Sequence, residues 1–134
     1  MALLLDTNAL VWLEYGDPRL GPSTKQTVQA AVARGDAFVC PITFWEIGLL
    51  VAKRRMSLGI ALPAFRTRVL QAGYVERPID GQDTVAMATL PNFHADPADR
   101  LLVATAQNDG LTLITSDAKI LAWTGTLSRM DGRT

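Results

Sequence analysis

Leu3-Leu4-Leu5-Asp6-Thr7-Asn8 contains a short apolar run that ends in a carboxylate. The fold of the chain can be inferred starting from this stretch. The run has the length and character of a buried β-strand, and residues 9–13 then open a helical pattern with no linker between. In open α/β sheets, ligands collect beyond the carboxyl ends of the strands. Asp6 is therefore either the cap of the following helix or part of a functional site.

The composition is typical of one globular domain. The 134 residues are 49% hydrophobic and 19% charged, within the usual domain size of about 100–150 residues, so one domain is expected over residues 1–134. No apolar run approaches the roughly 20 residues of a membrane span, and the apolar stretch near Met1 lacks the basic flank of a secretory signal. We therefore expect a cytoplasmic protein without a membrane partner. Cys40 is the single cysteine, which excludes an intramolecular disulfide and a thiolate metal cluster.

Strand and helix patterns alternate along the chain. Strands are expected at residues 3–5, 37–40, 74–79 and 111–115. Helices are expected at residues 9–13, 25–34, 44–52, 62–72, 80–88, 97–108 and 118–123, and residues beyond Gly125 give no clear pattern. This alternation predicts an α/β fold with a mostly parallel central sheet and helices on both of its faces.

Four carboxylates fall at the end of a strand or near the start of a helix: Asp6, Glu46, Asp99 and Asp117. In a parallel α/β sheet those places share one edge, so the four acids are expected to converge. Capping is the alternative for each acid taken singly. Residues 43–46 fit a capping box, Asp96 fits an N-cap before Pro97, and Asp117 fits a cap of its own short helix.

Capping alone does not explain acids that face one another beside buried helix starts, because their repulsion would have to be relieved by protonation or by a cation. Oxygen ligands without a His or Cys pair indicate a hard cation, Mg²⁺ or Mn²⁺. The chemistry that follows is metal-assisted phosphoryl transfer or hydrolysis. Thr7, Asn8 and Thr115 are suited to orient the acids by hydrogen bonds, or else form ordinary strand-end turns.

Four motifs resemble, in order and spacing, those of PIN-domain ribonucleases, in particular the VapC toxins of VapBC toxin–antitoxin pairs. They are LLDTNAL at residues 4–10, PITFWEI at 41–47, HADPADRLL at 94–102 and LITSD at 113–117. The resemblance spans about Leu3 to Trp123. It implies a three-layer α/β/α sandwich, Mg²⁺- or Mn²⁺-dependent endonucleolytic cleavage of RNA, a homodimer, and inhibition by a cognate VapB-type antitoxin; tRNA is among the candidate substrates.

The resemblance also implies roles for the acids. By motif position, Asp6, Glu46 and Asp99 take the main catalytic and metal-ligand roles, and Asp117 takes the fourth, more variable one. Asp96 matches a common acid of the family but is interpreted mainly as a helix cap. His94 invites a general acid or base role, although a loop histidine beside a helix start is often structural.

The formal net charge of +0 leaves RNA affinity to local patches. Candidate RNA contacts are the cations Lys53, Arg54, Arg55, Arg66, Arg68 and Arg100, with a solvated helix face as the alternative. The region from Phe44 to Leu70 also carries more apolar residues than one narrow helix stripe needs: Trp45, Leu49, Met56, Leu58 and Phe65. These residues form either core packing or a groove or dimer face that receives the antitoxin.

Other functions stay open from the sequence. A phosphatase with Asp6 as nucleophile requires a second Asp two residues later, where Asn8 stands. A receiver-like regulatory domain requires a phosphoacceptor Asp after the third strand and a late Lys, which Asp80 and Lys119 supply only loosely. The remaining alternative is a catalytically silent PIN-fold binding module.

Overall fold

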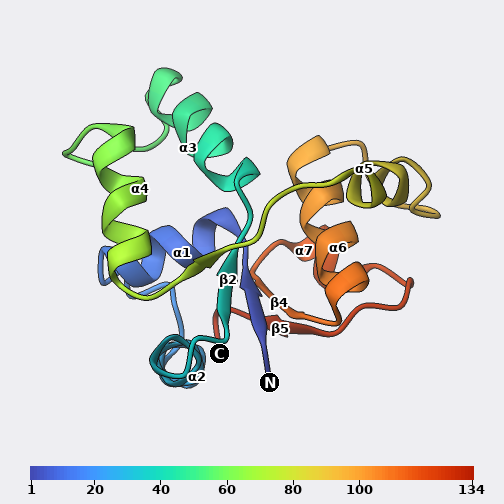
Figure 1. The fold of residues 1–134 in the computed structure, drawn as a ribbon, viewed down its shortest axis with the longest axis horizontal. Coiled ribbons are helices and arrows are strands. Elements are labelled where there is room, and N and C mark those ends of the chain that lie inside the picture. Colours follow the sequence, from blue (N-terminus) through green and yellow to red (C-terminus); the bar gives the residue numbers. More distant parts are fainter.

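The computed structural model describes residues 1–134 as five strands and seven helices (Figure 1). The strands are β1 (Leu3–Leu5), β2 (Ala37–Val39), β3 (Val75–Glu76), β4 (Thr112–Thr115) and β5 (Arg129–Asp131). The helices are α1 (Thr7–Glu14), α2 (Pro22–Ala33), α3 (Ile42–Ala52), α4 (Leu62–Gln71), α5 (Gly81–Ala88), α6 (Pro97–Asp109) and α7 (Ala118–Ala122). None of the helices combines the length and the apolar character that a membrane crossing needs.

The strands form one sheet in the order β3-β2-β1-β4-β5, with every neighbouring pair parallel. The expected mostly parallel sheet is therefore confirmed and is parallel throughout. β1 lies in the middle, where Leu3 pairs with Ala37 on one side and with Thr112 on the other. All three leucines of β1 are fully buried, as expected for a central strand covered on both faces.

Helices cover both faces of the sheet, which confirms the three-layer sandwich. Leu3 and Leu5 pack with residues of α1, α2, α3 and α4, whereas Leu4 packs with residues of α6 and α7. This division follows from the alternation of side chains along a strand. Figure 1 shows the two groups of helices on opposite sides of the sheet, with α1 to α4 on one side and α5 to α7 on the other.

The structure differs from the sequence-based expectation in a few elements. β5 lies in the segment beyond Gly125 that gave no clear pattern, and it is ordered by pairing with β4. α2 begins at Pro22, earlier than expected, because a proline is favoured in the first turn of a helix. The expected strand over residues 74–79 shrinks to the two residues of β3.

Candidate metal centre

Asp6 is the single residue between β1 and α1, so its position follows directly from the strand-to-helix switch. Its amide donates to the Ile114 carbonyl of β4 (3.0 Å), and its Oδ1 accepts from the Ala9 amide (2.8 Å). Burial raises the pKa of Asp6 to about 6; the Ala9 amide and the Thr115 hydroxyl oppose this rise, and nearby carboxylates add to it. Asp6 therefore caps α1 and is also a buried acid at the carboxyl edge of the sheet.

Glu46 lies one turn inside α3. The expected capping box over residues 43–46 is wrong, because α3 already begins at Ile42 after Pro41, and Thr43 thus lies within the helix. The Thr43 hydroxyl instead accepts a hydrogen bond from the Thr7 hydroxyl (3.3 Å). Burial raises the pKa of the Glu46 carboxyl, and the negative charges of Asp99 and Asp96 raise it further.

Asp99 lies in the first turn of α6, where the cap at Asp96 is confirmed by a hydrogen bond from the Asp99 amide to Asp96 Oδ1 (3.1 Å). The Asp99 side chain contacts His94, with 2.7 Å between Nε2 and Oδ2. Burial raises the pKa of Asp99, the His94 hydrogen bond opposes this, and Asp96 and Asp117 add repulsion. The contact brings the loop histidine to the acid cluster.

Asp117 follows β4 and caps α7, since its Oδ2 accepts from the Ile120 amide (2.9 Å). Its own amide donates to the Thr115 hydroxyl (3.1 Å). The expected cap is therefore confirmed. Thr115 contacts the loop that carries Asp117 and lies against Asp6 as well.

The four acids meet in one cavity of about 240 Å³ at the carboxyl edge of the sheet. Its lining residues are Asp6, Thr7, Asn8, Glu46, Leu50, Asp96, Asp99, Leu102 and Asp117. One ligand atom from each of Glu46, Asp96 and Asp99 lies within 4.8 Å of the others, and the same holds for His94, Asp99 and Asp117. Such a mainly oxygen donor set suits a hard divalent cation.

The sequence favours Asp96 mainly as a helix cap, and the structure shows that it both caps α6 and lines the cavity. The same residue type serves both purposes, because a helix N-terminus favours a carboxylate and lies at the carboxyl edge of the sheet. The position of Asp96 before Pro97 was the available signal. The roles of the acids as metal ligands stay a prediction.

The candidate RNA-binding cations divide into engaged and free side chains. Arg66 pairs with Glu76 (2.8 Å), and Arg68 donates to the Glu14 carbonyl (2.6 Å). Arg100 donates to the backbone carbonyls of Met87, Phe93 and His94, and thereby fixes the loop before α6.

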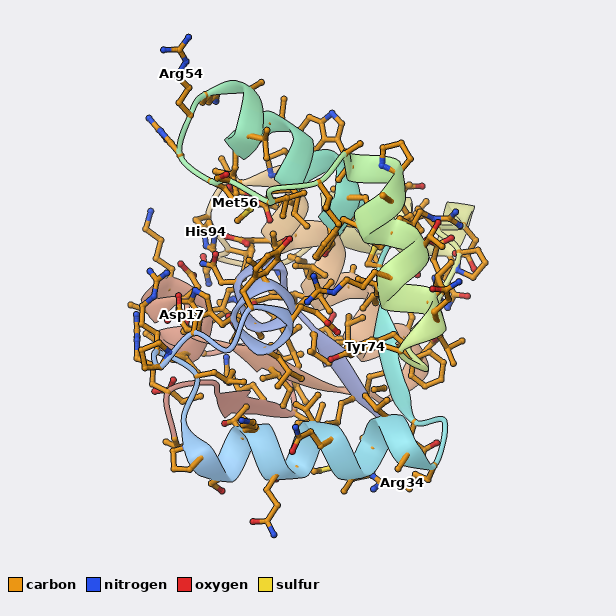
Figure 2. All side chains as sticks on the ribbon, turned by 90° about the vertical axis from the view of Figure 1, so that its left-hand side faces the viewer. Asp17, Arg34, Arg54, Met56, Tyr74 and His94 are labelled. Atoms are coloured by element: carbon orange, nitrogen blue, oxygen red, sulfur yellow. The ribbon has the colours of Figure 1, made fainter.

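The remaining three cations, Lys53, Arg54 and Arg55, are exposed and form no ion pair with a carboxylate. They follow the last turn of α3, and Figure 2 shows Arg54 extended away from the rest of the chain. Of the six candidates, these three are thus the ones whose charge is open to an anionic partner.

The apolar residues of the α3–α4 region fall into a buried group and an exposed group. Leu58 and Phe65 are buried in the core, and Met56 packs partly against it. In contrast, Trp45 and Leu49 of α3 are 51% and 37% exposed. They are four residues apart and therefore share one face of the helix. Core packing thus explains only some of these residues.

Comparisons with known proteins agree with the resemblance seen in the motifs. The family model described as PIN domain matches residues 3–123. The chain is 26% identical over 118 residues to Ribonuclease VapC22 of Mycobacterium tuberculosis, covering 88% of each chain. A toxin–antitoxin complex from Klebsiella pneumoniae gives a TM-score of 0.65 at 21% identity over 98% of each chain. VapBC2 from Rickettsia felis, bound to a DNA fragment from its promoter, gives 0.69 at 15% identity, covering 98% of this chain and 100% of the other.

Proposed function

The chain belongs to the PIN domain family, and from this premise we propose that it is a Mg²⁺- or Mn²⁺-dependent endoribonuclease that hydrolyses RNA phosphodiester bonds. The observation that carries the proposal is the convergence of Asp6, Glu46, Asp99 and Asp117 on one cavity. Ribonuclease VapC22, to which the chain is 26% identical over 118 residues, supports the proposal by its name.

The charges in the cavity fit a divalent cation. Burial raises the pKa of Asp6, Glu46 and Asp99. None of the ion pairs formed by Lys or Arg involves these acids. A site rich in carboxylates and without a compensating side-chain cation is one in which a bound metal ion relieves the repulsion.

Asp6, Glu46 and Asp99 would hold the ion, with Asp117 as the fourth ligand. A divalent ion there supplies charge stabilisation for the phosphodiester and acidity for water. The chain itself fixes the carboxylates: the Ala9 amide holds Oδ1 of Asp6, and His94 holds Oδ2 of Asp99. Thr7 lines the cavity beside Glu46 and opposes the rise of the Glu46 pKa, so Thr7 is suited to orient that carboxylate if its hydroxyl turns from Thr43.

The phosphatase and receiver-like alternatives lack their required groups. Asn8 is exposed and lines the cavity where the phosphatase would need its second Asp. Asp80 is taken up in the capping box of α5 with Asp83, where the receiver-like reading would need a phosphoacceptor. A catalytically silent binding module is the remaining alternative, and it is the one that the cleavage experiment addresses.

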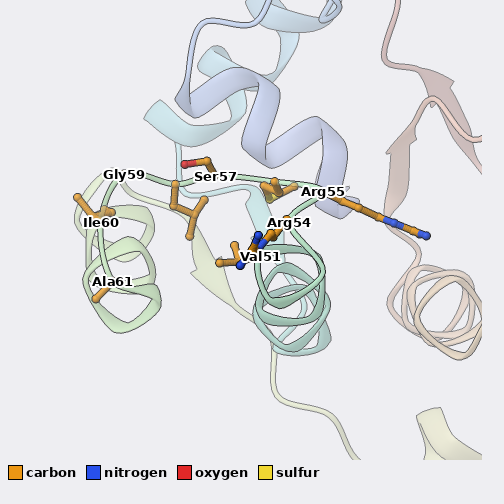
Figure 3. A pocket seen from close by; sticks show the side chains of 9 residues that line it. Val51, Arg54, Arg55, Ser57, Gly59, Ile60 and Ala61 are labelled. Atoms are coloured by element: carbon orange, nitrogen blue, oxygen red, sulfur yellow. The ribbon is translucent and has the colours of Figure 1, made fainter.

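The neighbouring structures are toxin–antitoxin complexes, and we propose that this chain is likewise the toxin of a type II module, a homodimer neutralised by a VapB-type antitoxin. The exposed face of α3 with Trp45 and Leu49 is one surface for such contacts. A cavity of about 770 Å³ lies at the C-terminal end of α3, lined by Val51 and by residues of the loop that leads into α4. Figure 3 shows Val51 and Arg54 at its α3 side and Ile60 and Ala61 at its α4 side.

The test is cleavage of end-labelled tRNA and messenger-like RNA by the purified protein with Mg²⁺, Mn²⁺ or chelator, beside Asp99→Asn. Metal-dependent cleavage that is lost in Asp99→Asn is the expected result. Asp36→Asn is the matched control, because Asp36 precedes β2 at the opposite edge of the sheet and should leave cleavage unchanged. No cleavage of any RNA, together with no metal binding by calorimetry, would contradict the proposal and leave a binding module.

A further inference from the structure

A second cavity, of about 300 Å³, lies next to the acid cavity and is not used by the proposed metal centre. Its lining residues come from the loop before α6 and from α7 with the residues that follow it: Asn92, Phe93, His94, Lys119, Ala122, Trp123 and Thr124. We refer to it as the aromatic cavity. His94 lines it and also contacts Asp99 of the acid cavity (2.7 Å), so the two cavities lie on either side of this pair.

Two aromatic side chains, Phe93 and Trp123, line the aromatic cavity. Phe93 and Trp123 are 8% and 7% exposed, and their rings meet edge to face with 5.3 Å between centroids. The Trp123 indole N–H donates to the Pro91 carbonyl (2.9 Å), and Phe93 stacks on His94 with 4.3 Å between centroids. Arg100 also lies over the Phe93 ring, with 5.8 Å from its Cζ to the centroid. Both rings are therefore fixed in place, and only a small part of each is open to the cavity.

The rim of the aromatic cavity is polar and cationic. Lys119 is exposed and forms no ion pair with a carboxylate, whereas nearby Arg100 is fully engaged with backbone carbonyls. Asn92 is exposed, and its side-chain amide forms none of the hydrogen bonds within the chain. Lys119 thus offers a positive charge, and Asn92 offers both a donor and an acceptor.

We propose that the aromatic cavity is a nucleotide subsite that holds the nucleotide next to the scissile phosphate. The base contacts the small exposed parts of Phe93 and Trp123, Lys119 binds a phosphate of the same nucleotide, and Asn92 contacts the edge of the base. Aromatic side chains combined with cations are the usual means of holding single-stranded nucleic acid. The volume lies at the lower end of small-molecule sites, about 300–1,000 Å³, which suits one nucleotide.

The inference rests on the proposed function, because it takes the acid cavity as the place where the phosphodiester is cut. Asp117 lines the acid cavity, and Lys119 follows it by two residues on α7. A chain that crosses the His94–Asp99 pair therefore passes from the acids to the cation within a short distance. The subsite therefore sets the orientation of the RNA chain, in addition to the attraction of a metal ion for the RNA phosphates.

Nucleoside monophosphates test the subsite directly, since they contain no phosphodiester bond to cut. The indole N–H signals of the three tryptophans are followed by NMR during titration with AMP, GMP, CMP and UMP. Assignment uses Trp12→Phe and Trp45→Phe, so that Trp123 stays in place. The expected result is a saturable shift of the Trp123 signal alone. A response to inorganic phosphate equal to that to AMP would overturn the binding of the base, and no Trp123 shift with any nucleotide would overturn the subsite.

Lys119→Ala tests the phosphate contact, with Lys25→Ala as the matched control because Lys25 is an exposed lysine of α2 without an ion pair. Binding of a short labelled RNA is measured by fluorescence anisotropy in chelator at several salt concentrations. One lost phosphate contact is expected to reduce the slope of log K against log salt by about 0.7. An unchanged slope in Lys119→Ala would overturn the role of Lys119.

Calorimetry of Mn²⁺ binding separates failure of the subsite from failure of the proposed function. Lys119→Ala should bind Mn²⁺ as the parent protein does, because Lys119 does not line the acid cavity. RNA cleavage with no response at Trp123 or Lys119 would refute the subsite and leave the ribonuclease proposal intact. Absence of both Mn²⁺ binding and cleavage would refute the ribonuclease proposal, whatever the nucleotide titration gives.

Discussion

Asp6→Asn is expected to stabilise the metal-free protein at neutral pH. Burial raises the pKa of Asp6 from its ordinary value of 3.8 to about 6, so the folded protein carries a poorly solvated carboxylate at pH 7. Asn removes the charge and retains an oxygen that accepts the Ala9 amide, a bond of 2.8 Å in the structure. The cap of α1 therefore persists while the cost of the buried charge is relieved.

The magnitude follows from the two pKa values, which lie about 2.2 pH units apart. One pH unit corresponds to about 1.4 kcal/mol, so the buried charge costs about 3 kcal/mol at pH 7. Because the pKa is higher in the folded state, that state binds more protons between the two values, and stability falls as pH rises from 3.8 to about 6. The advantage of Asp6→Asn should be about 1 kcal/mol near pH 4.5 and about 3 kcal/mol at pH 7.

Urea unfolding followed by circular dichroism in chelator measures this difference. Asp80→Asn is the matched control, because Asp80 also caps a helix, accepts from the Asp83 amide (3.0 Å), and has a side chain that is 57% exposed. Its effect should stay within about 0.5 kcal/mol. Adding Mn²⁺ should stabilise the parent protein more than Asp6→Asn, since binding to the folded state adds stability. Equal or lower stability of Asp6→Asn at pH 7 in chelator would refute the electrostatic reasoning.

Three further predictions concern parts of the molecule away from the acid cavity. Arg77→Met should cost about 3–5 kcal/mol in urea unfolding, because it leaves the fully buried Asp83 carboxylate without its cation; a cost below about 1 kcal/mol would contradict this. Phe65→Ala should cost about 3–5 kcal/mol and Phe65→Leu clearly less, since Phe65 is fully buried; equal costs would count against a packing effect. Burial raises the pKa of Cys40 to about 11, so a thiol reagent at pH 8 should label it only in urea, and rapid labelling of the folded protein would contradict this.

The alternation of strands and helices could be predicted because most elements carry their own local pattern. β1, β2 and β4 are short apolar runs bounded by breaks, and their burial follows from that composition. β5 could not be predicted, since Arg129–Asp131 has no apolar run of its own. Its order comes from pairing with β4, where Leu113 meets Arg129 and Thr115 meets Asp131. That information is held in residues far away along the chain.

The convergence of the acids could be predicted from topology alone, because parallel strands end at the same edge. The partners of individual side chains could not. Arg100 follows Asp99 in sequence and resembles a free cation beside an acid, yet it holds three backbone carbonyls. His94 lies in a loop, and its contact with Asp99 depends on how that loop packs before α6. Such contacts between elements leave no periodic pattern in the sequence.

Three of the acids that line the cavity, Asp6, Asp96 and Asp117, are also helix caps. Each cap uses one carboxylate oxygen: Oδ1 of Asp6 for α1, Oδ1 of Asp96 for α6, and Oδ2 of Asp117 for α7. The other oxygen of each remains a potential ligand. The three helices begin at one edge, and their N-terminal dipoles partly offset the negative charge gathered there. Substitution by Asn therefore removes charge and keeps the cap, whereas substitution by Ala removes both, and only the first separates the chemistry of the site from its structure.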